Sequence, residues 1–400
     1  MLFWQYLFII SCFLVFYNYA GYAIIVLLVN KLEKNKKGLA GIESATLAEE
    51  LPGVSFIVAA YNEEDCILEK ITNSLQQDYP REKIEFLFIT DGSTDRTAGI
   101  CGQNTSIRTL HQPERKGKSA ALNRAVTEAR YEILIFSDAN TILNKEAVRY
   151  ITRHYRDEKV GGVAGEKKVL PAAAGTDEVG EGEGLYWKYE SFLKKSDAAF
   201  YSVAGAAGEL FSFRSRLYDP LPHNIILDDF VSSLKVAQKG YRIQYEPEAY
   251  AMELPSFSLV DEQKRKVRIA AGGFQAIVLL APLLAFWKSP RLSFLYISHR
   301  VLRWTLSPLC MILAFIANAV LFFQSAGLLY TLLFLGQLGF YGIAVAAWLV
   351  PSLKKQSKMI KLASYFVFMN TAVILGFFRF LRGNQSATWE KAQRASAAIH

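Results

Sequence analysis

Three segments of similar construction decide the fold of this 400-residue chain: VSFIVAAYNEE (54–64), IEFLFITDGSTD (84–95) and EILIFSDAN (132–140). Each one starts as a short apolar run, typical of a buried strand, and ends in polar and acidic residues. Amphipathic helical patterns lie between them, at 64–76 and 118–129. Strands that alternate with helices predict parallel βαβ units, in which ligands bind at the carboxyl ends of the strands. The sequence therefore predicts an α/β, Rossmann-like domain with acidic residues gathered along one edge of its sheet.

Apolar stretches flank this domain on both sides. Residues 1–30 and 304–353 contain no Asp, Glu, Lys or Arg. The first stretch is long enough for one crossing of a ~30 Å hydrocarbon layer, and the second is long enough for two, with a tight turn at 324–327. A further run at 362–378 is just long enough to cross. We therefore predict four crossings; the apolar stretch 274–287 is short and favours an interfacial helix, although a fifth crossing there stays open.

Basic residues gather beside the apolar stretches. The formal net charge is +8, and four lysines within 31–37 directly follow the first apolar stretch. Lysines next to a membrane span usually lie on the cytoplasmic side, where membrane lipids are anionic, so the charge does not call for nucleic acid. We therefore expect a multi-pass protein of the inner (cytoplasmic) membrane with its middle domain in the cytoplasm. No CxxC or Cys/His spacing indicates zinc, and we expect reduced thiols at Cys12, Cys66, Cys101 and Cys310.

These patterns divide the chain into six parts. The acidic, glycine-rich run at 175–184 has the composition of a mobile loop inside the middle domain. The predicted parts are an N-terminal transmembrane helix (1–30), a cytoplasmic linker (31–51), the α/β domain (52–270), interfacial helices (271–300), about three C-terminal transmembrane helices (301–382) and a tail (383–400).

Six motifs, in a fixed order, resemble those of one enzyme family. Together they resemble the membrane-bound, inverting family-two glycosyltransferases with the GT-A fold, in the branch related to cellulose, hyaluronan and poly-N-acetylglucosamine synthases. The resemblance covers residues 54–275 and the flanking helices. It implies transfer of a sugar from a nucleotide diphosphate sugar, with uridine diphosphate favoured, to a lipid-linked or saccharide acceptor. The motifs are VAAYNEE (58–64), TDGSTD (90–95), KGKSAALN (116–123), SDAN (137–140), LDD (227–229) and RKVR (265–268).

The resemblance also implies how the donor is held. Asp138 stands at the metal-binding position of the family and would hold Mg²⁺ or Mn²⁺, hard cations that bridge carboxylates to phosphates. The second acidic residue of that motif is Asn140 here, whose amide ligates without adding charge, so we expect weaker metal affinity. Lys118 would approach the diphosphate. The base and ribose would contact Tyr61, Glu63 and Asp91, whose acidic groups accept hydrogen bonds.

The acceptor side is implied in the same way. An attacking hydroxyl needs a general base, and the resemblance assigns that role to Asp229, with Asp228 beside it raising its proton affinity. The two residues also suit the N-terminus of a helix, which is the alternative role. Small residues let a sugar approach the backbone. The acceptor region would contain Gly205, Gly208 and Glu209, with Tyr186 and Trp187 either stacking on a sugar ring or filling the core.

The last motif departs from the pattern of the polymerising synthases. They carry Gln-x-x-Arg-Trp where this chain has Arg265, Arg268 and Ile269. Arginines still suit a diphosphate, and a lipid-facing basic helix is the alternative. Because the tryptophan is missing, we favour transfer of a single sugar over a processive synthase that exports its polymer. A third possibility is a non-catalytic export or regulatory subunit. The sequence does not decide the donor sugar, the linkage or the oligomeric state.

Overall fold

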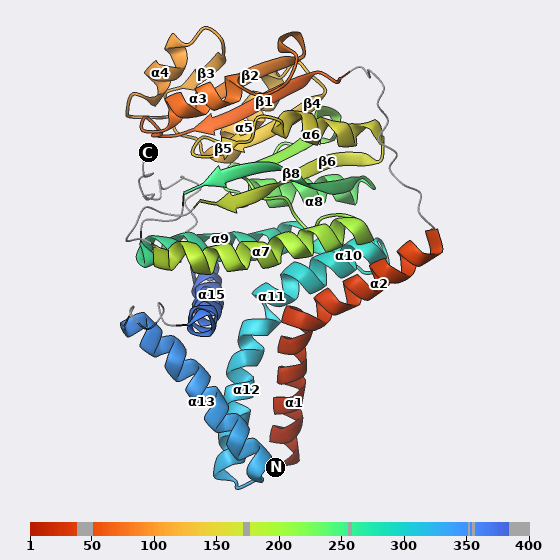
Figure 1. Cartoon of the computed structure of the whole chain (residues 1–400), viewed down its shortest axis with the longest axis vertical. Helices are drawn as coiled ribbons and strands as arrows, with labels where there is room; N and C mark the ends of the chain where they lie inside the picture. Colours follow the sequence, from red (N-terminus) through yellow and green to blue (C-terminus); the bar gives the residue numbers. More distant parts are fainter. Residues whose placement is uncertain (38–50, 171–176, 255–257, 351–352, 354–356, 384–400) are drawn as a thin grey trace.

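The computed structural model describes residues 1–37, 51–170, 177–254, 258–350, 353 and 357–383. Its middle part is built on one eight-stranded sheet with the order β3-β2-β1-β4-β7-β6-β8-β5. The sheet stands on a layer of crosswise helices, and apolar helices extend beyond that layer (Figure 1). The strands are β1 Val54–Ala60, β2 Ile84–Asp91, β3 Arg108–Gln112, β4 Ile133–Asp138, β5 Ile142–Leu143, β6 Val160–Val169, β7 Leu210–Arg214 and β8 Arg242–Glu253.

The register of the sheet places the acidic strand ends side by side. Strand β1 pairs in parallel with β2 on one side and β4 on the other. Ala60 pairs with Thr90, and Ala59 pairs with Asp138. The predicted shared edge is therefore confirmed. Beyond β4 the sheet is mixed, because β7 runs antiparallel to both β4 and β6.

Helices cover both faces of the sheet. Alternate residues of a strand point to opposite faces, so Phe56 packs in the core under α3, α4 and α6 while Ile57 packs in the core under α5 and α8. All seven residues of β1 are buried, as expected for a central strand. These helices are α3 Ile67–Leu75, α4 Thr97–Gln103, α5 Lys118–Glu128, α6 Ala147–Thr152 and α8 Asp228–Gln238.

The crosswise layer beneath the sheet differs from the sequence prediction. The expected loop at 175–184 is wrong, because helix α7 (Asp177–Phe200) begins within it. The glycines there disfavour a helix locally, but the rest of α7 packs through buried residues such as Leu193. The stretch 274–287 is divided between the end of α9 (Leu259–Leu279) and a short 3-10 turn, Ala281–Leu284. The layer continues through α10 Pro290–Tyr296, a π turn Ile297–Val301 and α11 Leu302–Trp304.

Four helices in the described part of the chain are long and apolar enough to cross a membrane: Leu2–Glu33, Leu306–Phe323, Leu328–Leu349 and Met359–Leu381. They are the four stretches that the sequence marks. The first bends at a π turn, Tyr17–Gly21, between α1 (Leu2–Phe16) and α2 (Tyr22–Lys37). Helices α12 (Leu306–Phe323) and α13 (Leu328–Leu349) extend away from the sheet, whereas α15 (Lys358–Leu381) is seen nearly end-on beneath α7 and α9 (Figure 1). Most of the linker 31–51 and nearly all of the tail 383–400 lie outside the described residues.

Candidate active site

Strand ends and helix starts bring opposite charges together at the edge of the sheet. Asp138 ends β4, Lys118 begins α5, and Asp228 begins α8. The Nζ atom of Lys118 lies 2.7 Å from Oδ1 of Asp138 and 3.9 Å from Oδ2 of Asp228. Segments that are 90 residues apart in the chain (138 to 228) therefore share one cation.

Gly208 marks the point where these charges converge. A Cβ atom placed on Gly208 would lie 3.4 Å from Oδ2 of Asp229, 3.4 Å from Nζ of Lys118 and 3.6 Å from Oδ2 of Asp138. Glycine is the one residue that leaves this point open for a ligand. The metal-site candidate and the base candidate thus face the same small volume.

Burial and neighbouring charges shift the pKa values of Asp229, Asp138 and Lys118 by different amounts. Burial, with a smaller contribution from the charge of Asp228, raises the pKa of Asp229 to about 7 against the opposing effect of Lys118. Burial also raises the pKa of Asp138, although the ammonium of Lys118 opposes this. Burial lowers the pKa of Lys118, but the charges of Asp138, Asp228 and Asp229 outweigh burial and hold it above its usual value. Lys118 therefore stays cationic, and Asp229 is poised to exchange a proton near neutral pH.

A cavity of about 1110 Å³ contains this point and most of the predicted site residues. It extends from the sheet edge to the apolar helix α15, where Met369, Ala372 and Val373 line it. A space of this size accommodates a nucleotide sugar together with part of an acceptor. The predicted residues that line it are Glu63, Lys118, Asp138, Asn140, Gly208, Glu209, Asp228, Asp229, Arg265 and Arg268.

Three predicted residues do not line the cavity. The buried carboxylate of Asp91 accepts hydrogen bonds from the backbone N–H groups of Lys116 and Gly117, at 3.1 and 2.7 Å. The ring of Tyr61 stacks under the guanidinium of Arg115, 3.8 Å from the ring centroid. Gly205 has a φ of +102° and lies against the ring of Phe230. Asp91 thus fixes the loop that places Lys118, while Gly205 lies under the residue next to Asp229.

The oxygen atoms around Asp138 fit a hard divalent cation in part. Asp138 and the amide of Asn140 line the same cavity, and Nδ2 of Asn140 donates to Oε1 of Glu253 at 3.3 Å. Among the described residues, no group of three or more His, Cys, Asp or Glu side chains could hold a metal ion. Two protein oxygen ligands suit a cation that takes its remaining ligands from phosphate and water, as Mg²⁺ does.

Two basic residues of the last motif, Arg265 and Lys266, already contact an acidic residue of the same helix. The guanidinium of Arg265 makes two hydrogen bonds to Glu262, at 3.0 and 3.1 Å, and Lys266 lies 3.4 Å from the same buried carboxylate. The cavity lining also includes Arg268. Helix α9 therefore presents a basic face to the cavity, not to lipid alone.

Sequence reasoning missed several residues of the site. Lys70 is fully buried beneath the acidic turn, where its ammonium donates to Oγ of Ser137 at 2.7 Å and to the carbonyl of Thr141 at 2.9 Å. Lys70 could have been found from the sequence, because it is a lysine on the apolar face of the helix that follows the first strand. Glu190, Lys194, Arg300 and Trp304 also line the cavity, and no local pattern marks them.

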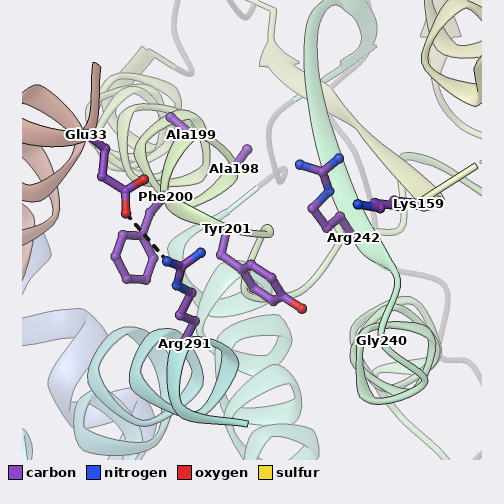
Figure 2. A pocket seen from close by; sticks show the side chains of 9 residues that line it. All are labelled: Glu33, Lys159, Ala198, Ala199, Phe200, Tyr201, Gly240, Arg242 and Arg291. Carbon is purple, nitrogen blue, oxygen red and sulfur yellow. Dashed lines mark ion pairs between the residues drawn. The ribbon is translucent and has the colours of Figure 1, made fainter. Parts of the chain in front are cut away.

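A second, smaller cavity of about 280 Å³ lies where α2, α7 and α10 meet the base of β8. Figure 2 shows Glu33 pointing toward Arg291, at a distance of 3.7 Å between the charged groups. None of the predicted site residues lines it. This cavity lies at the junction between the membrane helices and the domain, and it is not part of the site around Gly208.

The fold and the site define a glycosyltransferase domain of the GT-A class. Residues 55–219 match the family model described as Glycosyl transferase family 2, so this part of the chain is a domain of that family. The chain is similar to the poly-beta-1,6-N-acetyl-D-glucosamine synthases of Staphylococcus aureus (strain MSSA476) and Staphylococcus epidermidis. The first is 30% identical over 237 residues, 58% of this chain and 57% of the relative. The second is 27% identical over 256 residues, 62% of this chain and 60% of the relative. The chain thus spans less than two thirds of the length of these relatives.

A solved structure supports the fold over nearly the whole chain. The mannosyltransferase PcManGT from Pyrobaculum calidifontis, solved in complex with GDP-Man and Mn²⁺, superposes with a TM-score of 0.69 at 21% sequence identity. The match covers 94% of this chain and 99% of that chain. The predicted GT-A fold, with its flanking apolar helices, is therefore confirmed.

Proposed function

We propose that this protein is an inverting glycosyltransferase of the inner membrane. It transfers a sugar from a nucleotide diphosphate sugar to a lipid-linked or saccharide acceptor at the cytoplasmic face. The observation that carries the proposal is the convergence of Asp138, Asp229 and Lys118 on the open point at Gly208. A base, a cation and an oxygen ligand for a metal are what a single displacement at a sugar diphosphate requires.

The proposed reaction is one displacement. A hydroxyl oxygen of the acceptor forms a bond to the anomeric carbon of the donor while the bond from that carbon to the diphosphate oxygen breaks. Oδ2 of Asp229 accepts the hydroxyl proton, and its raised pKa, about 7, suits that role near neutral pH. The bond electrons go to the diphosphate, whose growing charge Lys118 stabilises. A divalent cation held by Asp138 and Asn140 would add further charge stabilisation at the diphosphate.

The donor would lie along the edge formed by β1, β2 and β4. The base and ribose would bind near Tyr61 and Glu63, which follow β1, and near the backbone that Asp91 holds at the end of β2. The similarity to N-acetylglucosamine polymer synthases favours a uridine nucleotide. A guanosine nucleotide is the competing choice, because the superposable structure holds GDP-Man.

Ligand-induced stabilisation tests the donor assignment. The purified full chain in detergent, with Mg²⁺ or Mn²⁺, is heated with a panel of uridine and guanosine diphosphate sugars, since a ligand of the folded state raises the Tm by mass action. One nucleotide sugar is expected to raise the Tm and to be slowly converted to nucleoside diphosphate. No shift and no release with any member of the panel would refute the proposal.

A processive polysaccharide synthase is the second candidate. The 30% identity to poly-beta-1,6-N-acetyl-D-glucosamine synthase favours it. Against it stands Ile269, which occupies the position of the tryptophan in the polymerising synthases. Product sizing decides between them: a ladder of lengths indicates a synthase, and one added sugar indicates single transfer. A non-catalytic export subunit would give neither product.

A further inference from the structure

The cavity around Gly208 continues past Asp229 toward the membrane helices, and its two ends differ in chemistry. Near the sheet it is lined by acidic residues and Lys118. Toward α15 the lining includes Trp304, the apolar side chains Met369, Ala372 and Val373, and one cation, Arg379. Helix α15 is one of the four helices apolar enough to lie in a membrane. The far end of the cavity thus suits a hydrocarbon chain.

The lining of the same cavity includes two cations that the reaction at the donor does not use. Lys194 of α7 is only 2% exposed, lines the cavity, and makes no hydrogen bond or ion pair with any residue that the structure describes. Its ammonium lies 5.4 Å from the centroid of the Trp187 ring. Glu166, Glu209 and Glu190 are the acidic groups that act on its charge, but in the described part of the chain none of them forms an ion pair with it. Burying an ammonium without an ion-pair partner is costly, so this position suits an anion.

Arg300 reaches the same cavity from the π turn after α10. Its Nε donates to the carbonyl of Ala204 at 3.0 Å, and its NH1 donates to Oε2 of Glu190 at 3.0 Å. The other oxygen of Glu190 accepts from Arg303. Both oxygens of Glu190 are thus occupied by arginines. The other two acidic neighbours of Lys194 also have partners, because Glu209 accepts from Lys167 and Glu166 accepts from Ser191 and Tyr245. The guanidinium of Arg300 is held rigidly where a phosphate can meet it.

Resting on the proposed function, we propose that the acceptor is a saccharide linked through phosphate to a long-chain lipid. Its sugar hydroxyl lies at Asp229, its phosphate lies between Lys194 and Arg300, and its chain runs past Trp304 along α15. The rings of Tyr186 and Trp187 flank the saccharide portion. The phosphate link is not broken: the only bonds that change are those of the displacement at the donor.

Binding of polyprenyl phosphate tests the proposal without knowledge of the acceptor sugar. The full chain in detergent, loaded with the nucleotide that stabilises it, is titrated with three probes: polyprenyl phosphate, the polyprenol of the same length, and inorganic phosphate. The Tm shift and the quenching of tryptophan fluorescence report binding. Polyprenyl phosphate is expected to bind at least about 10-fold more tightly than either other probe, because it alone satisfies both ends of the cavity.

Variants at neighbouring lysines of α7 locate the phosphate. Lys194→Met is expected to weaken polyprenyl phosphate about 10-fold or more and to leave polyprenol unchanged, and Lys194→Arg is expected to restore most of the affinity. Lys195→Met is the matched control, because Lys195 is the next residue of the same helix and is exposed. Should Lys194→Met fail to fold, the comparison of the three probes on the unaltered chain still shows whether binding requires both the phosphate and the lipid chain.

Three results would overturn the proposal. If polyprenol bound as tightly as polyprenyl phosphate, there would be no phosphate site. If inorganic phosphate bound as tightly, the lipid chain would not contribute to binding. If Lys195→Met lost as much affinity as Lys194→Met, the phosphate would not be bound by Lys194. Failure of the proposed function has a different signature, because then no nucleotide sugar stabilises the chain in the first place.

Discussion

The ammonium of Lys118 lies 2.7 Å from the carboxylate of Asp138, and the same ammonium is 3.9 Å from Asp228. One side chain from the start of α5 thereby links the end of a central strand to the start of the helix that carries Asp229. In the proposed function, Lys118 supplies the cation that the diphosphate of the donor needs. Its removal is expected to affect donor binding directly.

Replacing Lys118 tests that role. Lys118→Met is expected to weaken nucleotide sugar binding about 10- to 100-fold, the usual cost of losing charge-assisted hydrogen bonds. Lys118→Arg keeps the charge and is expected to lose much less. The dissociation constant of the stabilising nucleotide sugar, measured by calorimetry, checks this. Unchanged affinity in Lys118→Met would place the diphosphate elsewhere.

The pH dependence of turnover follows from the raised pKa of Asp229. A general base works only when it has lost its proton, so kcat/KM is expected to rise with pH through about 7 and to level off above it. The charge of Asp228 is one cause of the raised pKa, although burial is the larger one. Asp228→Asn is therefore expected to move the rise to lower pH without abolishing it. A rise at the same pH in both proteins would exclude this coupling.

Two nearby glycines are expected to respond differently to alanine. Gly205 has a φ of +102°, and its Cβ would fall 2.1 Å from a carbon of the Phe230 ring, so Gly205→Ala is expected to cost about 1–3 kcal/mol of stability. Gly208→Ala places its Cβ at ordinary contact distances of 3.4 to 3.6 Å and is expected to fold normally. Because that Cβ fills the point between the reacting groups, its kcat/KM is expected to fall at least about 10-fold. Thermal unfolding and initial rates on both variants compare the two effects, and a fully active Gly208→Ala would move the reaction away from this point.

Lys70 is expected to stabilise the turn that carries Asp138. Lys70→Met keeps the length of the side chain but leaves the Thr141 carbonyl without its buried donor, which is expected to cost about 1–3 kcal/mol of unfolding free energy. Burial lowers the pKa of Lys70 to about 7 from 10.5, so the unfolded chain binds more protons between these values. The stability of the unaltered protein, relative to Lys70→Met, is therefore expected to rise with pH from about 7 to 10.5. Denaturant unfolding across this range measures it, and a flat difference would mean that Lys70 titrates normally.

The polar residues at the carboxyl ends of the central strands could be predicted from local sequence patterns. β1, β2 and β4 are short apolar runs whose polar residues follow directly, so the position of Asp138 at a strand end is legible from the sequence. β8 could not be predicted in this way, because the exposed residues Pro247 and Glu248 interrupt its alternation of buried and half-buried residues. The glycines at the start of α7 obscured that helix. Tertiary packing, which no local pattern encodes, decides both.

The site was predictable only where a motif carries it. Asp229, Asp138 and Lys118 lie in recognisable motifs, and the structure brings all three to Gly208. Lys194 and Arg300 belong to separate helices, and only the folded chain places them on one cavity. The role of Asp91 also depends on folding, because its partners are backbone N–H groups 25 and 26 residues further along the chain.

The role of Asp229 as the base is tested by Asp229→Asn, which keeps the size of the side chain and removes the base. Release of nucleoside diphosphate and binding of the nucleotide sugar are measured on the same preparation. We expect turnover to fall by at least about 100-fold, within the contribution usual for a general base, while donor affinity stays within about 3-fold of the unaltered protein. Normal turnover in Asp229→Asn would contradict the assignment of the base and, with it, the proposed mechanism.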